Sequence, residues 1–533
     1  MSRSQKRASL PFICMLVIVM ALLSACGSPQ DPQPAAPAPP TTDTAEPVMG
    51  GVLRVAHNEV PPSVDMHWST SVSTMIIGTH VVETLFGHDE NYEMFPMLAD
   101  RYTVSDDGLT YVIHLREGVK FHNGEEMTSE DVVASLERWM TRGSVARGLA
   151  NSLESIEATG KYVVTFRLKH ELGTLIPILG MPNQGGGIYP KSLLDSVGEG
   201  NEITHPIGTG PYRFVENLPD RWIKLSRFED CVGRDDDVPR GYAGKKVAYF
   251  DEIVFVPVLD SNVRIAGVQS GDYHFGRSVP GDQYDLIDNA PGIEPVVTPF
   301  KGFVLNVFNK KQGVMSNKLV RQAFVAALDL DELILVAGPG PLGQLQPSLM
   351  PKESVWFSES GSEKYNEHNL ERAKELLSQS GYAGEPIRWL VTEGSRHDVA
   401  LAVQQQLEPL GFKFDIQIVD WPTLTERRAK PELMDIFSSE NTYRTDPTQM
   451  IIFTPTWPGW WENEDISRLM TELNRESDFD KRYAIWEEMQ AIFWEDVPAA
   501  RLWDYAHLNV LSNKLKGYTN MPDPIFWNVW LSD

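Results

Sequence analysis

The sequence predicts an α/β protein of two or three domains. Strand-like stretches rich in β-branched and aromatic residues alternate with stretches whose apolar residues recur at helical spacing. With 533 residues, the chain is too long for a single hydrophobic core. Because no low-complexity linker follows Gly50, we expect interleaved domains, with the chain crossing between them.

Four stretches are predicted to contain strands. We expect order to begin near Gly50, with the first strand in VLRVAHNEV at 52–60. The others are LTYVIHLREGVKF at 109–121, KYVVTFRLK at 161–169 and FDEIVFVPV at 250–258. Each combines β-branched and aromatic residues with turn residues around it, which is typical of strands.

Three stretches are predicted to be amphipathic helices with one face toward the core. TSEDVVASLERWM begins with a capping box at Thr128 or Ser129, and EHNLERAKELLSQSGY should end at Gly381. DKRYAIWEEMQAIFWEDVP should stop before Pro498. The expected core stripes are Val132, Val133, Leu136 and Trp139, then Leu370, Ala373, Leu376 and Leu377, then Ile485, Met489, Ile492 and Phe493.

The first residues predict export. Arg3, Lys6 and Arg7 precede an apolar run from Leu10 to Leu23, which suits a signal peptide and is short for a membrane span. Leu-Ser-Ala-Cys, ending at Cys26, resembles the lipobox of bacterial lipoproteins. The resemblance implies removal of residues 1–25 and diacylation of Cys26. A plain secretory signal with an incidental cysteine is the alternative.

Residues 26–49 are predicted to form a tether, because the prolines from Pro29 to Pro47 favour an extended polyproline II chain. Two acyl chains are enough for stable anchoring, so the expected location is the outer face of the cell membrane, or the periplasm if the cell has two membranes. No later segment is long and apolar enough to span a bilayer.

Charge and cysteine content limit the partners. The formal net charge of −26 argues against nucleic acid, because phosphates would be repelled. Cys14 lies in the predicted signal and Cys26 is the predicted lipidation site, so Cys231 is left without a disulfide partner. Scattered histidines give no paired metal-ligand spacing.

Motifs of catalysis are missing. The sequence has no G-x-S-x-G elbow, and HELGT at 170–174 lacks a zincin's second histidine. NQGGGIYPKS at 183–192 lacks the Gly-Lys-Ser/Thr of a phosphate loop, so we expect a flexible turn there. GRDDDVP at 233–239 lacks calcium-loop spacing, and SRHD at 395–398 does not form a triad by adjacency. We predict no enzyme activity, metal site or cofactor.

Six stretches, in order along the chain, resemble the bacterial extracellular solute-binding proteins of family 5, the substrate receptors of peptide, nickel and related ABC importers. The likeness covers roughly residues 50–533. The stretches are GGVLRVAHNEVPPSVDMH at 50–67, LADRYTVSDDGLTYVIHLREGVKFHNGEEMTSEDVVASLERW at 98–139, IGTGPYRFVE at 207–216, FDEIVFVPVLDSNVRIAGVQSGDY at 250–273, NKLVRQAFVAALD at 317–329 and YNEHNLERAKELLSQSGY at 365–382.

The resemblance implies a periplasmic-binding-protein-like fold of type II, cluster C. Two lobes close about a hinge, and an extra domain is inserted in the first lobe. Domain I would comprise 50–87, 205–300 and 506–533, domain II would be the insert at 88–204, and domain III would be the second lobe at 301–505. The ligand would lie between the lobes, and the closed form would dock on a permease.

One departure from the family bears on the ligand. Peptide-binding members carry an aspartate four residues before the proline of a D/E-P pair, and it grips the peptide's amino group. Here the position four before Pro447 is Tyr443. Neighbouring Arg444 could instead meet a carboxylate, or form a surface or interlobe ion pair.

Candidate ligand-binding residues come from both lobes. TPTWPGWWENED at 454–465 carries three tryptophans on a loop-like stretch, which either line a ligand cleft or pack against the domain surface. The full set is Ser69, Thr70, Ser71, Thr392, Glu393, Trp421, Asn441, Tyr443, Arg444, Asp446, Trp457, Trp460 and Trp461.

The predicted function is that of a monomeric, lipid-anchored binding protein of an ABC importer that captures a small polar solute, with a peptide expected first. An opine, an oligosaccharide or another polar solute is the alternative ligand. A lipid-anchored secreted hydrolase and an adhesive surface protein are the alternatives from other classes.

Overall fold

The computed structural model describes residues 46–142, 144–234 and 238–532. The predicted signal segment, Cys26 and all but the last residues of the predicted tether lie outside this part of the chain, as does the centre of GRDDDVP. Within the described part, no helix is long and apolar enough to cross a bilayer.

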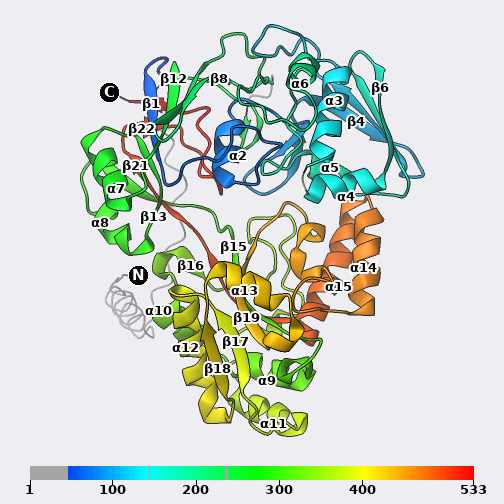
Figure 1. Ribbon diagram of the computed structural model, residues 1–533, viewed down its shortest axis with the longest axis vertical. Coiled ribbons are helices and arrows are strands. Elements are labelled where there is room, and N and C mark those ends of the chain that lie inside the picture. Colours follow the sequence, from blue (N-terminus) through cyan, green and yellow to red (C-terminus); the bar gives the residue numbers. More distant parts are fainter. Residues whose placement is uncertain (1–45, 143, 235–237, 533) are drawn as a thin grey trace, which may run out of the picture. The chain divides into compact units, whose positions relative to one another are not determined.

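A seven-stranded sheet joins strands that are far apart in the sequence, in the order β14-β21-β13-β1-β12-β9-β8. Figure 1 shows the early β1 beside β12 and near the late β21. Leu53 and Val55 of β1 are buried in the core of this sheet. The strands are β1 (Val52–His57), β8 (Tyr212–Leu218), β9 (Trp222–Arg227), β12 (Glu252–Pro257), β13 (Phe275–Val279), β14 (Ile293–Val297) and β21 (Leu508–Ser512).

A four-stranded antiparallel sheet lies between β1 and β8 in the sequence, in the order β4-β5-β7-β6. Its strands are β4 (Ala99–Val104), β5 (Thr110–Leu115), β6 (Leu153–Gly160) and β7 (Val163–Leu168), and α3 (Ser129–Met140) packs on it. The same region holds α4 (Ser144–Ser152), α5 (Leu175–Leu179), α6 (Lys191–Val197) and the hairpin of β2 (Phe86–His88) and β3 (Met94–Pro96).

A six-stranded sheet holds the later part of the chain, in the order β16-β20-β15-β19-β17-β18. Its strands are β15 (Gly302–Phe308), β16 (Gly343–Gln344), β17 (Ile387–Val391), β18 (Phe414–Ile418), β19 (Ile436–Thr442) and β20 (Ala499–Tyr505). The helices of this part are α9 (Lys318–Ala327), α10 (Leu330–Ala337), α11 (Leu370–Ser380), α12 (Ser395–Leu407), α13 (Trp421–Arg428), α14 (Glu464–Arg475) and α15 (Phe479–Asp496).

We call the residues around the seven- and four-stranded sheets (46–300 and 506–532) the first lobe, and those around the six-stranded sheet (301–505) the second lobe. The first lobe also contains α2 (Val72–Gly78), α7 (Ser261–Ser270), α8 (Tyr284–Asp288) and the strand pairs β10 (Pro239–Arg240) with β11 (Ala243–Gly244) and β22 (Leu515–Lys516) with β23 (Trp530–Leu531).

Two chain crossings connect the lobes, one between β14 and β15 and one between β20 and β21. They are hydrogen-bonded to each other: the Thr298 N–H donates to the His507 carbonyl at 2.9 Å, and the Lys301 N–H donates to the Tyr505 carbonyl at 2.9 Å. The His507 N–H also donates to Thr298 Oγ1 at 3.0 Å. The paired crossings are the place where backbone rotation would move one lobe against the other.

The predicted strands and helices are confirmed, with local differences. β5 ends at Leu115 because a turn follows, in which Gly118 has a φ of 73°. Thr128 is the N-cap of α3, and its N–H donates to Asp131 Oδ2 at 2.8 Å in the capping box. Gly381 ends α11 in the left-handed conformation, as expected.

The apolar stripes of α11 and α15 differ from the prediction. In α11, the predicted core residue Leu370 is exposed, and only Ala373 and Leu377 are buried. In α15, the buried stripe is displaced. Trp486, Met489 and Phe493 are buried, whereas the predicted Ile485 and Ile492 are only half-buried. Helix α15 carries apolar residues on more than one side. The spacing of apolar residues in the sequence therefore does not define which face is buried.

The loop at Gly185–Gly187 is close-packed rather than the flexible turn expected. All three glycines are buried. A Cβ on Gly185 would lie 1.8 Å from the Met181 carbonyl oxygen, and one on Gly187 would lie 2.7 Å from Val82 Cγ1. Glycine is required here because the backbone itself packs against its neighbours.

Candidate functional site

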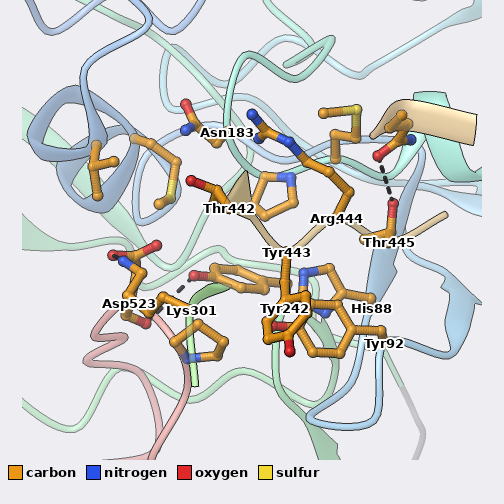
Figure 2. Close-up of a pocket in the computed structure, with 16 residues that line it drawn as sticks. His88, Tyr92, Asn183, Tyr242, Lys301, Thr442, Tyr443, Arg444, Thr445 and Asp523 are labelled. Carbon is orange, nitrogen blue, oxygen red and sulfur yellow. Dashed lines mark hydrogen bonds and ion pairs between the residues drawn. The ribbon is translucent and has the colours of Figure 1, made fainter. Parts of the chain in front are cut away.

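A cavity that is partly open to solvent, with about 630 Å³ of empty space, is lined by both lobes near the paired crossings. From the first lobe come Val72, Met75, His88, Tyr92, Met181, Pro182, Asn183, Tyr242, Pro522 and Asp523, and from the second lobe come Lys301, Thr442, Tyr443, Arg444, Thr445 and Gln449. Figure 2 shows this cavity with its lining side chains.

Tyr443 holds a hydroxyl whose hydrogen-bonding capacity is used up inside the second lobe. The hydroxyl donates to Asp504 Oδ1 at 2.7 Å and accepts from Gln346 Nε2 at 2.6 Å and Arg501 Nη2 at 3.2 Å. Burial raises the pKa of Tyr443 well above its ordinary value, so the phenol stays neutral. A phenol has one donor and two lone pairs, so Tyr443 offers the cavity its ring rather than its hydroxyl.

Arg444, the next residue, is half-buried at the cavity wall. Figure 2 shows its side chain extending toward Asn183 of the first lobe. Among the described residues, no carboxylate lies within ion-pair distance of its guanidinium. Burial lowers the pKa of Arg444, yet an arginine remains protonated at neutral pH.

Asp523 is the carboxylate of the cavity, and it is already neutralised. Lys301 Nζ lies 2.5 Å from its Oδ1, and Arg277 Nη2 lies 3.8 Å from the same oxygen. Lys301 belongs to the second lobe and Asp523 to the first, so this ion pair also joins the lobes beside the crossings.

Aromatic rings of the first lobe form the wall around the β2–β3 hairpin. His88 stacks on Tyr92 with ring centroids 5.1 Å apart and meets Tyr242 edge-on at 5.0 Å. Tyr92 has a φ of 63°, a left-handed conformation that is rare for a tyrosine and costs about 1–3 kcal/mol. Burial lowers the pKa of His88, so the imidazole is neutral at pH 7.

Two amide side chains in the cavity have buried atoms without a hydrogen-bond partner in the described structure. They are Asn183 Oδ1, an acceptor, and Gln449 Nε2, a donor. Gln449 uses its other end, because its Oε1 accepts from the Thr445 hydroxyl at 3.4 Å. Neither residue was a sequence-based candidate. The glycine-rich stretch that begins at Asn183 was the available signal, and its close packing fixes where Asn183 lies.

Of the candidates in the first lobe, Ser69, Thr70 and Ser71 form the segment that leads into α2. Ser71 caps that helix, with its Oγ accepting from the Ser73 N–H at 3.3 Å. The next residue, Val72, lines the cavity. Ser71 therefore positions the start of α2, and a role of all three residues in ligand binding stays a prediction.

Asn441 and Asp446 flank the cavity-lining segment of the second lobe. Asn441 is buried at the end of β19. Asp446 is fully buried, pairs with Arg482 at 2.9 Å and accepts from the Thr448 N–H at 3.0 Å. Asp446 therefore holds the backbone that follows Arg444 in place, whereas Asn441 Nδ2 donates to the adjacent Thr442 carbonyl at 3.4 Å.

Trp421, Trp457 and Thr392 gather around two arginines outside the cavity lining. The guanidinium carbons of Arg396 and Arg428 each lie 5.3 Å from the centroid of the half-exposed Trp421 ring. The Trp457 ring lies 6.0 Å from Arg428, and Arg396 donates to Thr392 Oγ1 at 3.2 Å. Glu393, the next residue, is exposed.

The two remaining tryptophans lie against the second lobe. Trp461 is buried and its Nε1 donates to Asp496 Oδ2 at 2.6 Å. Trp460 is half-buried, with Lys311 Nζ 5.8 Å from its ring centroid. The sequence left two alternatives for this loop, lining a ligand cleft or packing against the domain surface. Trp460 and Trp461 both pack against the second lobe.

A second cavity of about 1050 Å³ adjoins the first and shares Tyr92 and Thr445 with it. Tyr102 and Tyr111 of the four-stranded sheet line it from one side, and Trp356 and Phe479 of the second lobe line it from the other. Because the two cavities share these residues, the space between the lobes continues from the first cavity into the second.

Residues 93–461 match the model of a known family, described as bacterial extracellular solute-binding proteins, family 5. The chain belongs to this family. Proteins of this family bind solutes for transport and are not enzymes, so this chain is a transport binding protein.

Individual relatives of this family 5 protein match over most of their length. It is 27% identical to the probable peptide ABC transporter periplasmic-binding protein y4tO of Sinorhizobium fredii, over 84% of this chain and 88% of that protein. It is 27% identical to the glutathione-binding protein GsiB of Pectobacterium atrosepticum, over 87% of this chain and 90% of that protein.

A third relative also has a solved structure. The family 5 protein is 26% identical to the oligopeptide-binding protein AppA of Bacillus subtilis, over 99% of both chains. The structure of AppA in complex with a nonapeptide superposes with a TM-score of 0.70 at 25% identity, covering 92% of this chain and 100% of that one. This agreement confirms the predicted two-lobed α/β class.

Proposed function

We propose that this protein binds a peptide in the cavity between its lobes and delivers it to the permease of an ABC importer. The observation that carries the proposal is a cavity lined by both lobes beside two hydrogen-bonded chain crossings. Relatives whose names specify peptides or glutathione support a peptide as the ligand. Ligand contacts to both lobes would favour the closed arrangement, which the permease would recognise.

Native mass spectrometry of the protein as purified tests this function. A bound peptide should appear as a mass excess that is lost on denaturation, and tandem fragmentation should give its sequence. A protein that carries no ligand and captures no peptide from a peptic digest of casein would contradict the proposal.

We also propose that the chain is anchored outside the cytoplasm through lipid on Cys26, after removal of residues 1–25, with 26–49 as the tether. Cys26→Ala should then move the protein from the membrane pellet to the soluble fraction. Cys231→Ala is the matched control and should stay in the pellet. Membrane association that survives Cys26→Ala would contradict the anchor.

Two further proposals concern organisation. We propose domain I at 50–87, 205–300 and 506–533, the inserted domain II at 88–204 and the second lobe at 301–505, because each large sheet draws its strands from one of these sets. We propose a monomer, and sedimentation equilibrium tests it directly: a mass near 60 kDa is expected, and twice that mass contradicts it.

A further inference from the structure

We infer that the ligand presents a carboxylate next to an N–H group, as the C-terminal end of a peptide does, and that Arg444 binds the carboxylate while Asn183 accepts the N–H. This inference rests on the proposed function and names the chemistry of the ligand end that the first cavity receives.

The balance of charge in the cavity favours an anion. Its charged lining residues are Lys301, Arg444 and Asp523, and the neighbouring His88 is kept neutral by burial. Asp523 is neutralised by Lys301 at 2.5 Å and Arg277 at 3.8 Å. Within the described lining, Arg444 is therefore a cation that has no carboxylate partner. This holds although the chain as a whole is acidic, with a formal net charge of −26. A ligand anion can therefore pair with Arg444 without displacing an existing ion pair.

The half-buried position of Arg444 favours binding of a ligand carboxylate beside its guanidinium. Partial removal of a cation from water without a counter-ion is unfavourable, and a carboxylate that enters beside the half-buried Arg444 offsets that cost. The planar guanidinium matches a carboxylate with two parallel hydrogen bonds, which a lysine cannot do. The segment that carries it is fixed on both sides by the buried side chains of Tyr443 and Asp446.

The two unpaired amide atoms complete the pattern. Gln449 Nε2 is a second donor and Asn183 Oδ1 is an acceptor, and both are buried atoms without a partner in the described structure, on residues that line this cavity. Buried polar atoms are nearly always hydrogen-bonded, so these atoms indicate a missing polar partner. Two donors and one acceptor complement a carboxylate and its adjacent amide N–H.

An ammonium group finds no such partner in this cavity. Tyr443 stands at the position where the resemblance to peptide-binding members implies an aspartate that binds the amino group. Its hydroxyl is already hydrogen-bonded to three protein groups. The one carboxylate of the described lining, Asp523, is already paired. The cavity therefore selects the acidic end of its ligand rather than the basic end.

Chemically blocked peptide pools test the selection. We would incubate the protein with three portions of a peptic digest of casein: unmodified, methyl-esterified at carboxyl groups, and acetylated at amino groups. Bound peptides are then counted by mass spectrometry after removal of free peptide. The unmodified and acetylated pools should be captured equally, and capture of the esterified pool should fall at least tenfold.

Variants assign the effect to Arg444. With a captured peptide synthesised as the free acid and as the C-terminal amide, Arg444→Gln should weaken binding of the acid at least tenfold and bind both forms alike. Arg444→Lys should bind with intermediate affinity. Arg468→Gln removes an exposed arginine of the same lobe and should bind as the wild type. Thermal melting verifies that each variant is folded.

The outcomes distinguish failure of carboxylate recognition by Arg444 from failure of peptide binding itself. Equal capture of esterified and unmodified peptides, or unchanged acid binding by a folded Arg444→Gln, would overturn the inference and leave peptide binding standing. If no pool is captured at all, peptide binding itself fails, and the inference that rests on it falls with it.

Discussion

The hydroxyl of Tyr443 satisfies three side chains at once. Arg501 is fully buried, donates from its Nε to the Ser348 carbonyl at 3.0 Å and pairs closely with Asp504. Because this buried ion pair and Gln346 meet at one phenol oxygen, Tyr443 stabilises the second lobe from within while its ring faces the cavity. A residue can thus lie at a binding site and serve mainly to hold it in shape.

Removing that hydroxyl should lower stability more than affinity. Tyr443→Phe leaves Asp504, Gln346 and Arg501 each short of a partner, and we expect a loss of about 1–3 kcal/mol in the free energy of unfolding. Urea denaturation measures it. Tyr162→Phe, whose hydroxyl reaches the exposed Glu126, is the control and should lose less than about 1 kcal/mol. Equal losses in the two variants would contradict this role.

At residue scale, two of the sequence-based candidates, Tyr443 and Arg444, line the cavity. Tyr443 could be chosen because it departs from a family pattern, and Arg444 because it is the next residue. Tyr92 and Gln449 could not be chosen, because a cavity wall depends on which distant loops meet, and the glycine-rich stretch at Asn183 was a signal that was interpreted as a flexible turn. The partners of Tyr443 are 58 to 97 positions away in the sequence, and no local pattern encodes them.

At the scale of elements, the loop before α5 touches α14 of the other lobe. The Gly173 N–H donates to the Asn474 carbonyl at 2.7 Å. A Cβ on Gly173 would lie 1.7 Å from the Glu476 carbonyl oxygen, so only glycine allows the two backbones to approach this closely. The contact joins the four-stranded-sheet region to the second lobe at a distance from the paired crossings.

Disturbing this contact should weaken ligand binding if closure of the lobes contributes to affinity. Gly173→Ala forces the two backbones apart, and we expect affinity for a captured peptide to fall about tenfold or more, since steric overpacking costs about 1–3 kcal/mol. Isothermal titration calorimetry measures it. Gly148→Ala, in α4 with open space around its Cβ, is the control and should bind normally. Unchanged affinity in Gly173→Ala would show that the contact does not contribute to binding.

Elements with local signals were the easiest to predict. The capping box at Thr128 and the left-handed Gly381 act within one turn of their helices, so the sequence around them is sufficient. The Gly185–Gly187 loop was misjudged because glycine serves both flexibility and close packing. Only the positions of Met181 and Val82 distinguish the two.

Across the whole molecule, several histidines are buried in the neutral form. The pKa falls from 6.5 to about 3 for His57 and His80, and to about 4 for His67 and His122, in each case chiefly because burial disfavours the charge. His80 accepts the Phe526 N–H at its Nε2 at 2.9 Å while its Nδ1 lies 2.7 Å from the Ile76 carbonyl. Protonation of Nε2 would break the first of these hydrogen bonds.

Stability should therefore fall as the pH is lowered from about 6.5 toward 4. In that window the unfolded chain binds protons that the folded protein excludes, so the free energy of unfolding rises with pH. Urea denaturation at pH 5 and pH 7 measures the difference. His80→Gln should reduce it by up to about 1.4 kcal/mol per pH unit, while the exposed His170→Gln should leave it unchanged. Equal stability at the two pH values would contradict the buried neutral histidines.

The central claim is that a peptide binds between the two lobes. Hydrogen exchange with and without a saturating captured peptide tests it most directly. We predict slowed exchange in both lobes at once, in segments 88–92 and 181–187 of the first lobe and 442–449 of the second. Protection confined to one lobe, or located away from these segments, would contradict the account.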